Sequence, residues 1–274
     1  MQIKTLVENT TVSKHLAAVH GLSFYIETKQ HKILFDLGPA DFFERNASCL
    51  GVDISDVDIV VISHGHVDHG GGLRRFLELN KKAIIYVQQQ AFQNHFSRRL
   101  PTEVVAIGLE KELSANKRIC FVDKQEKLDD SLTIFADVAS GRLQPADNKF
   151  LLMESWLGLV ADDFVHEQYL VIGEKGKTFL LAGCAHKGIL NILNRFHERI
   201  GGYPDVVISG FHLHSQSRQR SEAPEKIRQL GEALRKIGSQ FYTCHCTGIV
   251  PYEQLKADLG DQIHYLAAGS QIII

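Results

Sequence analysis

The sequence has no long apolar run and no strong excess of either charge, and both absences narrow its class. No hydrophobic stretch approaches the roughly 20 residues that a membrane-spanning helix needs. Residues 1–7 are too short and too polar for a secretion signal. The net charge of −2 gives no general electrostatic reason to bind nucleic acid or an anionic membrane. We therefore expect neither a nucleic-acid partner nor a membrane partner.

Cysteine is also scarce. The five cysteines, an odd number in a chain of 274 residues, do not suggest a disulfide framework, so we expect a protein of the reducing cytoplasm. With 44% hydrophobic and 23% charged residues, the composition is that of an ordinary globular protein. No Pro/Ser-rich linker or short repeat divides the chain, and we expect a single domain over residues 1–274. The sequence is compatible with a monomer or a homodimer.

Short apolar runs predict β-strands along most of the chain. They cover residues 3–7, 22–27, 33–35, 59–62, 84–87, 132–136, 169–172, 179–182, 206–208 and 272–274. Apolar residues with a period near 3.6 predict helices over 189–200 and up to residue 237, and Ser221 is the expected cap of the second. Pro224 and Pro251 suit the first turns of this helix and of a last one.

The order of these elements favours an α/β (α+β) fold. The first half is rich in strands and the second half alternates strand and helix, which predicts two packed sheets with helices outside them. Residues 88–130 are polar and irregular, and we expect them to form a flap or lid.

The strongest chemical signal lies in residues 58–72, which read Asp-Ile-Val-Val-Ile-Ser-His-Gly-His-Val-Asp-His-Gly-Gly-Gly. A buried strand ends in His64 and His66, and residues two apart in an extended segment point the same way. The two imidazoles can therefore converge on one metal ion. Asp68 and His69 follow as the chain turns and can face a second ion. The pattern predicts a metal site.

Three later segments share one layout, an apolar strand that ends in small residues with His or Cys. They are residues 179–188, 205–214 and 241–248. Ligands of α/β proteins gather at the carboxyl ends of strands, so these segments are expected to meet the 64–69 cluster. His186 and His245 are candidate ligands. His212 is a candidate ligand, acid/base or substrate contact.

Other residues have more than one interpretation. Cys184 could donate a thiolate to a metal, and it could equally be a small buried core residue. Asp36 ends a strand and is expected to orient a ligand histidine by accepting its hydrogen bond. A separate structural zinc site at Cys244 and Cys246 is not expected, because the pair has no matching second pair. Five other histidines are expected to be exposed or capping residues: His15, His31, His95, His197 and His264. His214 is expected on the periphery of the site, and His20 and His166 could reach the site but are not expected to be ligands.

The run His64-Gly65-His66-Val67-Asp68-His69 resembles the His-x-His-x-Asp-His signature of the metallo-β-lactamase superfamily. The chain is similar to one subgroup of it, that of the archaeal dihydropterin-ribofuranosylaminobenzene phosphate synthase. The markers are residues 183–188 (Gly-Cys-Ala-His-Lys-Gly), 210–213 (Gly-Phe-His-Leu) and 244–248 (Cys-His-Cys-Thr-Gly).

This resemblance implies a four-layer αββα sandwich with two divalent metal ions, zinc first and Mn²⁺ or Fe²⁺ as alternatives. His64, His66 and His186 would hold one ion; Asp68, His69 and His245 would hold the other. The family usually bridges the ions with an aspartate, and Cys184 occupies the corresponding place here. A thiolate ligand there would favour zinc.

The resemblance favours a metal-dependent hydrolase that acts on a small phosphorylated or ester substrate. A water held by two cations would have its pKa lowered from about 15.7 toward 7, and a metal-bound hydroxide would attack. Asp68 would orient that water and His212 would protonate the leaving group. The alternatives are a synthase-like condensing enzyme that releases pyrophosphate from a pterin substrate, and a non-catalytic metal-binding protein.

Overall fold

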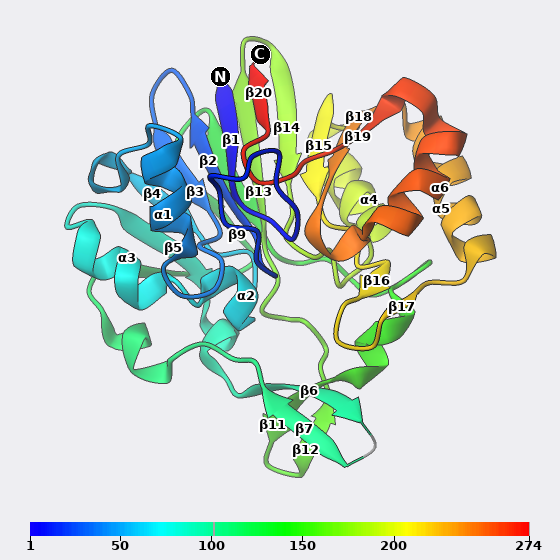
Figure 1. The fold of residues 1–274 in the computed structure, drawn as a ribbon, viewed down its shortest axis with the longest axis horizontal. Helices are drawn as coiled ribbons and strands as arrows, with labels where there is room; N and C mark the ends of the chain where they lie inside the picture. The colour runs from blue at the N-terminus through cyan, green and yellow to red at the C-terminus, as the bar shows by residue number, and fades with distance from the viewer. Residues whose placement is uncertain (101, 274) are drawn as a thin grey trace.

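Two seven-stranded sheets form the centre of the computed structural model, which describes residues 1–100 and 102–273 (Figure 1). The first sheet has the order β20-β1-β2-β3-β4-β5-β8. Its strands are β1 (Gln2–Val7), β2 (Ser23–Glu27), β3 (Lys32–Phe35), β4 (Ile59–Val61), β5 (Ile84–Gln88), β8 (Ile119–Val122) and β20 (Gln271–Ile273). Within this sheet β3, β4, β5 and β8 run parallel.

The second sheet has the order β19-β18-β15-β14-β13-β10-β9. Its strands are β9 (Gln125–Lys127), β10 (Leu132–Phe135), β13 (Tyr169–Glu174), β14 (Lys177–Leu181), β15 (Val206–Ser209), β18 (Gln240–Thr243) and β19 (Ile263–Tyr265). Each of the predicted apolar runs lies in one of the two sheets. Residue 274, placed in the last strand from the sequence, lies outside the described residues.

Strand alternation shows how the layers stack. In β3, Ile33 and Phe35 pack between the two sheets, while Leu34 packs under the helices of the first sheet. In β14, Phe179 and Leu181 face the first sheet, while Leu180 packs under the helices of the second sheet. Both sheets are therefore buried on both faces, and the predicted αββα sandwich is confirmed.

The helices cover the outer faces. On the first sheet lie α1 (Phe42–Cys49), α2 (Val67–Gly70) and α3 (Leu73–Leu79); on the second lie α4 (Ile189–Ile200), α5 (Pro224–Ile237) and α6 (Ile249–Leu259). Pro224 and Pro251 stand in first turns as predicted. The prediction that Ser221 caps α5 is wrong, because Ser221 belongs to β17 and Ala223 is the N-cap.

A third, four-stranded sheet projects from one end of the sandwich (Figure 1). It contains β6 (His95–Leu100), β7 (Glu103–Ala106), β11 (Leu151–Ser155) and β12 (Gly158–Ala161). Beside it lies the small hairpin of β16 (His214–Ser215) and β17 (Arg220–Ser221). Short 3-10 turns connect other elements, at Ile54–Asp56, Gln89–Phe92, Lys111–Ala115, Ala146–Phe150, His245–Thr247 and Gly260–Gln262.

Residues 88–130, expected to form one flap or lid, are instead divided among three sheets. Residues 88–130 supply β6 and β7 to the projecting sheet, whereas β8 and β9 complete the edges of the two main sheets. No helix within residues 1–100 and 102–273 has the length and hydrophobicity needed to cross a bilayer.

Candidate metal centre

The loop after β4 forms the floor of the site. The loop turns at Gly65, where a Cβ atom would lie only 2.4 Å from the carbonyl oxygen of Ala91, so that no larger residue fits without movement. His66 then has extended backbone angles as the N-cap of α2. As a result His64 and His66 leave the strand end together, and the short helix presents Asp68 and His69 beside them.

A first donor group consists of His64, His66 and His186. The Nε2 atom of His64 lies 3.0 Å from Nδ1 of His66. The ring of His186, from the loop after β14, has its centroid 4.9 Å and 5.0 Å from the centroids of these two rings. All three side chains are buried, and Nε2 of His186 has no hydrogen-bond partner. The structure therefore brings three imidazole nitrogens around one point.

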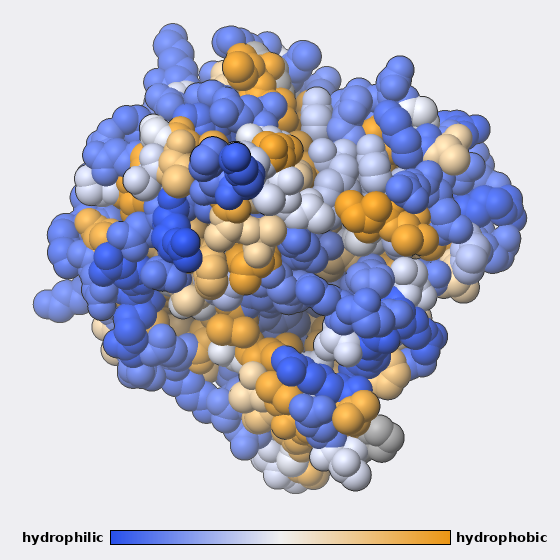
Figure 2. Space-filling view, viewed as in Figure 1, coloured by the Kyte–Doolittle hydropathy of each residue, from blue (hydrophilic) through white to orange (hydrophobic). Residues whose placement is uncertain are grey.

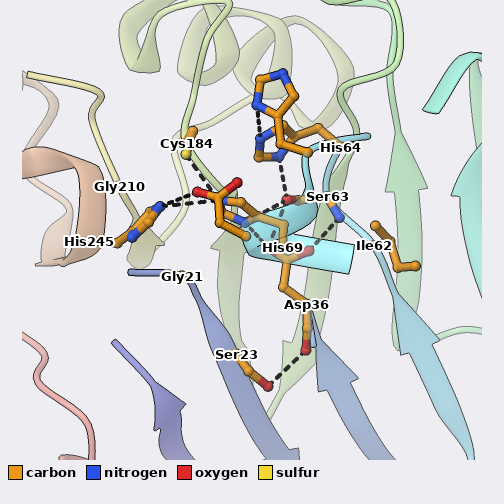
Figure 3. Close-up of polar contacts among 12 residues, drawn as sticks. Gly21, Ser23, Asp36, Ile62, Ser63, His64, His69, Cys184, Gly210 and His245 are labelled. Atoms are coloured by element: carbon orange, nitrogen blue, oxygen red, sulfur yellow. Dashed lines mark hydrogen bonds and ion pairs between the residues drawn. The ribbon is translucent and has the colours of Figure 1, made fainter. Parts of the chain in front are cut away.

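A second donor group consists of Asp68, His69, His245 and Cys184, and Figure 3 shows the last three side chains pointing toward one another. The Nε2 atoms of His69 and His245 are 3.2 Å apart. Asp68 Oδ2 is 3.7 Å from the first and 3.3 Å from the second. Cys184 Sγ lies 3.1 Å from Nε2 of His69.

These distances fit divalent cations. Ligand atoms 2.0–2.3 Å from a tetrahedral ion lie about 3.3–3.7 Å from one another. One atom pair in the first group and four in the second are 3.0–3.7 Å apart, and the possible ligand atoms of His64, His66 and His186 all lie within 4.8 Å of one another. Buried nitrogens normally have hydrogen-bond partners, so the inward-facing nitrogen of His186 is unusual for a structural histidine. The site thus offers one group of three nitrogens and another of two nitrogens, a carboxylate and a thiol.

In His64, His69, His186 and His245, the ring nitrogen that faces away from the donor groups lies beside an oxygen atom. Asp36 Oδ2 lies 2.6 Å from Nδ1 of His69, and Ser63 Oγ lies 2.9 Å from Nδ1 of His64. Two amide oxygens do the same: Asn148 Oδ1 is 3.1 Å from Nδ1 of His186, and Asn9 Oδ1 is 2.8 Å from Nδ1 of His245. A hydrogen on each Nδ1 leaves the Nε2 lone pair directed inward, as metal-ligating histidines require.

Burial sets the protonation of the first group. It lowers the pKa of His64, His66 and His186 well below the ordinary value, and neighbouring imidazoles add to the effect. Their nitrogens are therefore neutral and available near pH 7. Burial also disfavours the charged form of His69, but the Asp36 and Asp68 carboxylates outweigh it and raise the pKa to about 9. A cation bound in the second group would displace that proton.

Burial raises the pKa of the Cys184 thiol well above its ordinary value. The side chain is almost fully buried, yet its sulfur is directed at His69, so it combines the two interpretations that the sequence allowed. Without a cation it is a neutral thiol; a cation would draw off the proton.

The ends of several strands at the site have an unusual backbone. Asp36, Ala185, His212 and His245 all have φ between 48° and 62°, in the left-handed region that non-glycine residues seldom adopt. Such strain costs about 1–3 kcal/mol per residue and is concentrated at functional sites.

A pocket of about 350 Å³ opens above both donor groups. This volume is within the range of small-molecule sites. His212 lines the pocket; its Nδ1 is buried without a hydrogen-bond partner, and its ring centroid lies 4.3 Å from that of His186. His214, expected on the periphery, lines the pocket as well, and so does His20, whose Nε2 is 3.3 Å from Asp68 Oδ2.

Behind His66 lies a buried cluster that the sequence did not predict. His95 was expected to be exposed or capping, and this is wrong: only 1% of it is exposed, and its Nδ1 is 2.8 Å from Asp162 Oδ2. His166 accepts a hydrogen bond from the Gly65 backbone at 2.9 Å, so its other nitrogen, 3.3 Å from both Asp162 oxygens, carries the hydrogen. His166 therefore holds the loop between His64 and His66.

A sequence profile of the metallo-β-lactamase superfamily matches residues 16–209, most of the chain. The donor groups at the strand ends and the αββα layers agree with that match. The chain therefore belongs to the metallo-β-lactamase superfamily.

Two curated relatives come from Methanocaldococcus jannaschii. The 7,8-dihydropterin-6-methyl-4-(β-D-ribofuranosyl)-aminobenzene-5′-phosphate synthase is 27% identical over 278 residues, 92% of this chain and 89% of the relative. An uncharacterized protein is 28% identical over 252 residues, 90% of each chain.

Solved structures share the fold. Tm1679, a metal-dependent hydrolase of the β-lactamase superfamily, superimposes with a TM-score of 0.84 at 26% identity, covering 100% of this chain and 99% of that one. Zn²⁺-bound PqqB from Methylobacterium extorquens superimposes with a TM-score of 0.59 at 11% identity over 100% of both chains.

Proposed function

We propose that this protein is a metal-dependent hydrolase that acts on a small phosphorylated or ester substrate. The observation that carries the proposal is the pair of buried donor groups, in which neighbouring ligand atoms such as those of His64 and His66 or His69 and His245 lie 3.0–3.2 Å apart, beneath a pocket of about 350 Å³. The likeness to Tm1679 supports hydrolysis as the reaction class.

Two divalent cations, zinc first and Mn²⁺ or Fe²⁺ as alternatives, would occupy the two groups. His64, His66 and His186 would hold one; Asp68, His69 and His245, with Cys184 as the fourth donor, would hold the other. When bound, such cations lower the pKa of water toward 7 and stabilise negative charge that develops on a phosphoryl or acyl oxygen.

The protein's own residues would orient the reactants and move protons. Asp68 Oδ2 lies 3.3 Å from Nε2 of His20, whose side chain is 44% exposed, so a proton accepted at Asp68 has a route to solvent. His212 lines the pocket, where its imidazole would give a proton to the leaving group.

A second candidate is a condensing enzyme that releases pyrophosphate from a pterin substrate. It is favoured by the 27% identity to the archaeal dihydropterin-linked synthase over 92% of this chain. The same donor groups would serve a pyrophosphate leaving group, since its oxygens are good ligands for divalent cations. A non-catalytic metal-binding protein is the third candidate, because the donor groups alone do not require turnover.

The test is a turnover assay of zinc-loaded protein on three substrate sets. These are phosphodiesters, carboxylic esters, and a pterin pyrophosphate with an aromatic acceptor. Metal-dependent hydrolysis of either of the first two would support the hydrolase, and pyrophosphate release only with the acceptor would support the synthase. If the protein retains metal but turns over none of the three sets, the result would support the non-catalytic metal-binding protein.

Two variants link turnover to the site. Asp68→Asn and His212→Ala should each lower kcat, the second by about 10²–10⁴-fold as expected for loss of a general acid. His197→Ala is the matched control, because this exposed histidine of α4 stacks on Tyr203 outside the pocket. Equal activity of His212→Ala and His197→Ala would refute the role of His212.

A further inference from the structure

Strand β6 presents alternate side chains to the site. His95 lies in the buried cluster behind His66, and Ser97 and Arg99 line the pocket. The register of β6 is irregular between Arg98 and Leu100, and at this point Arg99 lines the pocket while Arg98 does not. The strand thus runs from the metal centre outward and brings Arg99 to the pocket mouth, about 13 Å along the chain from His95.

The facing wall supplies a second arginine. Arg218, in the turn between β16 and β17, also lines the pocket together with the hydroxyl-bearing residues Ser215 and Ser217. Its Nη1 donates to Ser215 Oγ at 3.2 Å, and its Nη2 donates to the backbone oxygen of Arg98. Its guanidinium carbon lies 3.9 Å from the centre of the Phe150 ring. These contacts hold the guanidinium plane in place while leaving three of its five N–H groups for other partners.

The two arginines differ in charge compensation. Asp147 Oδ2 lies 3.8 Å from Nη1 of Arg218 and offsets part of its charge. Arg99 is exposed, and within residues 1–100 and 102–273 it forms no salt bridge. The mouth of the pocket therefore carries net positive charge on a protein whose overall charge is −2. Figure 2 shows the projecting sheet that carries β6 as a lobe below the sandwich.

We propose that Arg99 and Arg218, with the hydroxyls of Ser97, Ser215 and Ser217, form a binding subsite for a phosphate group at the pocket mouth. Guanidinium groups and hydroxyls are the donors that recognise phosphate oxygens. The substrate would then be elongated, with the bond to be broken over the metal centre and a separate phosphate at the far end. This assignment rests on the proposed function and narrows its substrate class.

The volume of the pocket, about 350 Å³, argues for a small phosphorylated molecule as the ligand. A nucleic acid would need an extended basic surface, which an overall charge of −2 does not favour.

The test measures binding of inorganic phosphate to the zinc-loaded protein by titration calorimetry at low ionic strength. Arg99→Gln should weaken one class of phosphate site about ten-fold, as expected for loss of a charge-assisted hydrogen bond at an exposed position. Arg99→Lys should recover part of the affinity. Arg98→Gln is the matched control, since it removes the same charge from the neighbouring exposed residue, which does not line the pocket, and should bind as wild type.

A chelator separates this subsite from the metal centre. The phosphate binding that depends on Arg99 should persist after metal removal, whereas phosphate held by the cations should be lost. Identical phosphate affinity in Arg99→Gln, Arg98→Gln and wild type would overturn the subsite. Because the readout is binding, that result would leave the hydrolase proposal intact, and absence of turnover would leave the subsite intact.

Discussion

Substitution of Asp36 is an informative test of the metal centre, because Asp36 contacts the candidate ligand His69 but is not itself a candidate ligand. Its carboxylate is fully buried and accepts three hydrogen bonds: from the Ser63 backbone at 2.7 Å, from Ser63 Oγ at 2.8 Å and from Nδ1 of His69 at 2.6 Å. In Asp36→Asn, one oxygen becomes an NH₂ group that cannot accept. The hydrogen on Nδ1 of His69 then lacks a charged acceptor, and the tautomer with hydrogen on Nε2 competes. Nε2 is the atom that faces His245 and Asp68.

We therefore expect Asp36→Asn to weaken the cation of the second group by about 10–100-fold, or roughly 1.4–2.7 kcal/mol. Titration of metal-free protein with Co²⁺, followed by its visible absorption, reports the two sites separately. Zinc content after dialysis, measured by mass spectrometry, should fall from two ions per chain toward one.

The chain contains a matched control away from the site. Asp129 accepts from the Ser131 backbone at 2.6 Å, from Ser131 Oγ at 2.8 Å and from Nε2 of His31 at 2.5 Å, an arrangement closely similar to that of Asp36. Asp129→Asn should retain both cations. Wild-type affinity for both cations in Asp36→Asn would show that Asp36 does not set the tautomer of His69.

Two further predictions follow from the same geometry. Asn148→Leu should weaken only the cation of the first group and Asn9→Leu only that of the second, because each asparagine accepts from one ligand histidine; equal loss of both cations in either variant would contradict this assignment. In metal-free protein, the three histidines of the first group have lowered pKa values, so below about pH 6.5 the unfolded chain takes up protons that the folded chain refuses. The free energy of unfolding should then decrease, as the pH is lowered, by up to about 1.4 kcal/mol per pH unit for each histidine. Equal urea midpoints at pH 7 and pH 5 would exclude this pH dependence.

Much of the fold was predictable because both main sheets are buried on both faces. Continuous apolar runs such as those at β4 and β14 signal such strands directly, and the helix over Ile189–Ile200 shows its apolar face as a 3.6-residue period. The projecting sheet could not be predicted from the sequence, because its strands lack this continuous apolar signal. In β6, His-Phe-Ser-Arg-Arg-Leu, one face is directed at a polar site, so hydrophobicity alternates weakly.

The candidate site also has a part that the sequence predicts and a part that only the fold reveals. His64, His66, Asp68 and His69 lie within six residues, so their spacing alone indicates a metal site. Asn9 and Asn148 are isolated polar residues that meet their histidines only through the fold, and no local pattern marks them. His166 lies 101 positions from Gly65, the backbone group that it binds. Supporting residues of this kind become visible only in three dimensions.

The proposed chemistry requires two cations at the strand ends. Diffraction data collected on both sides of the zinc absorption edge, from crystals of protein purified without chelator, test it most directly. We expect two anomalous peaks per chain, one among His64, His66 and His186 and the other among Asp68, His69 and His245. The absence of both peaks, or density at another place in the chain, would contradict it.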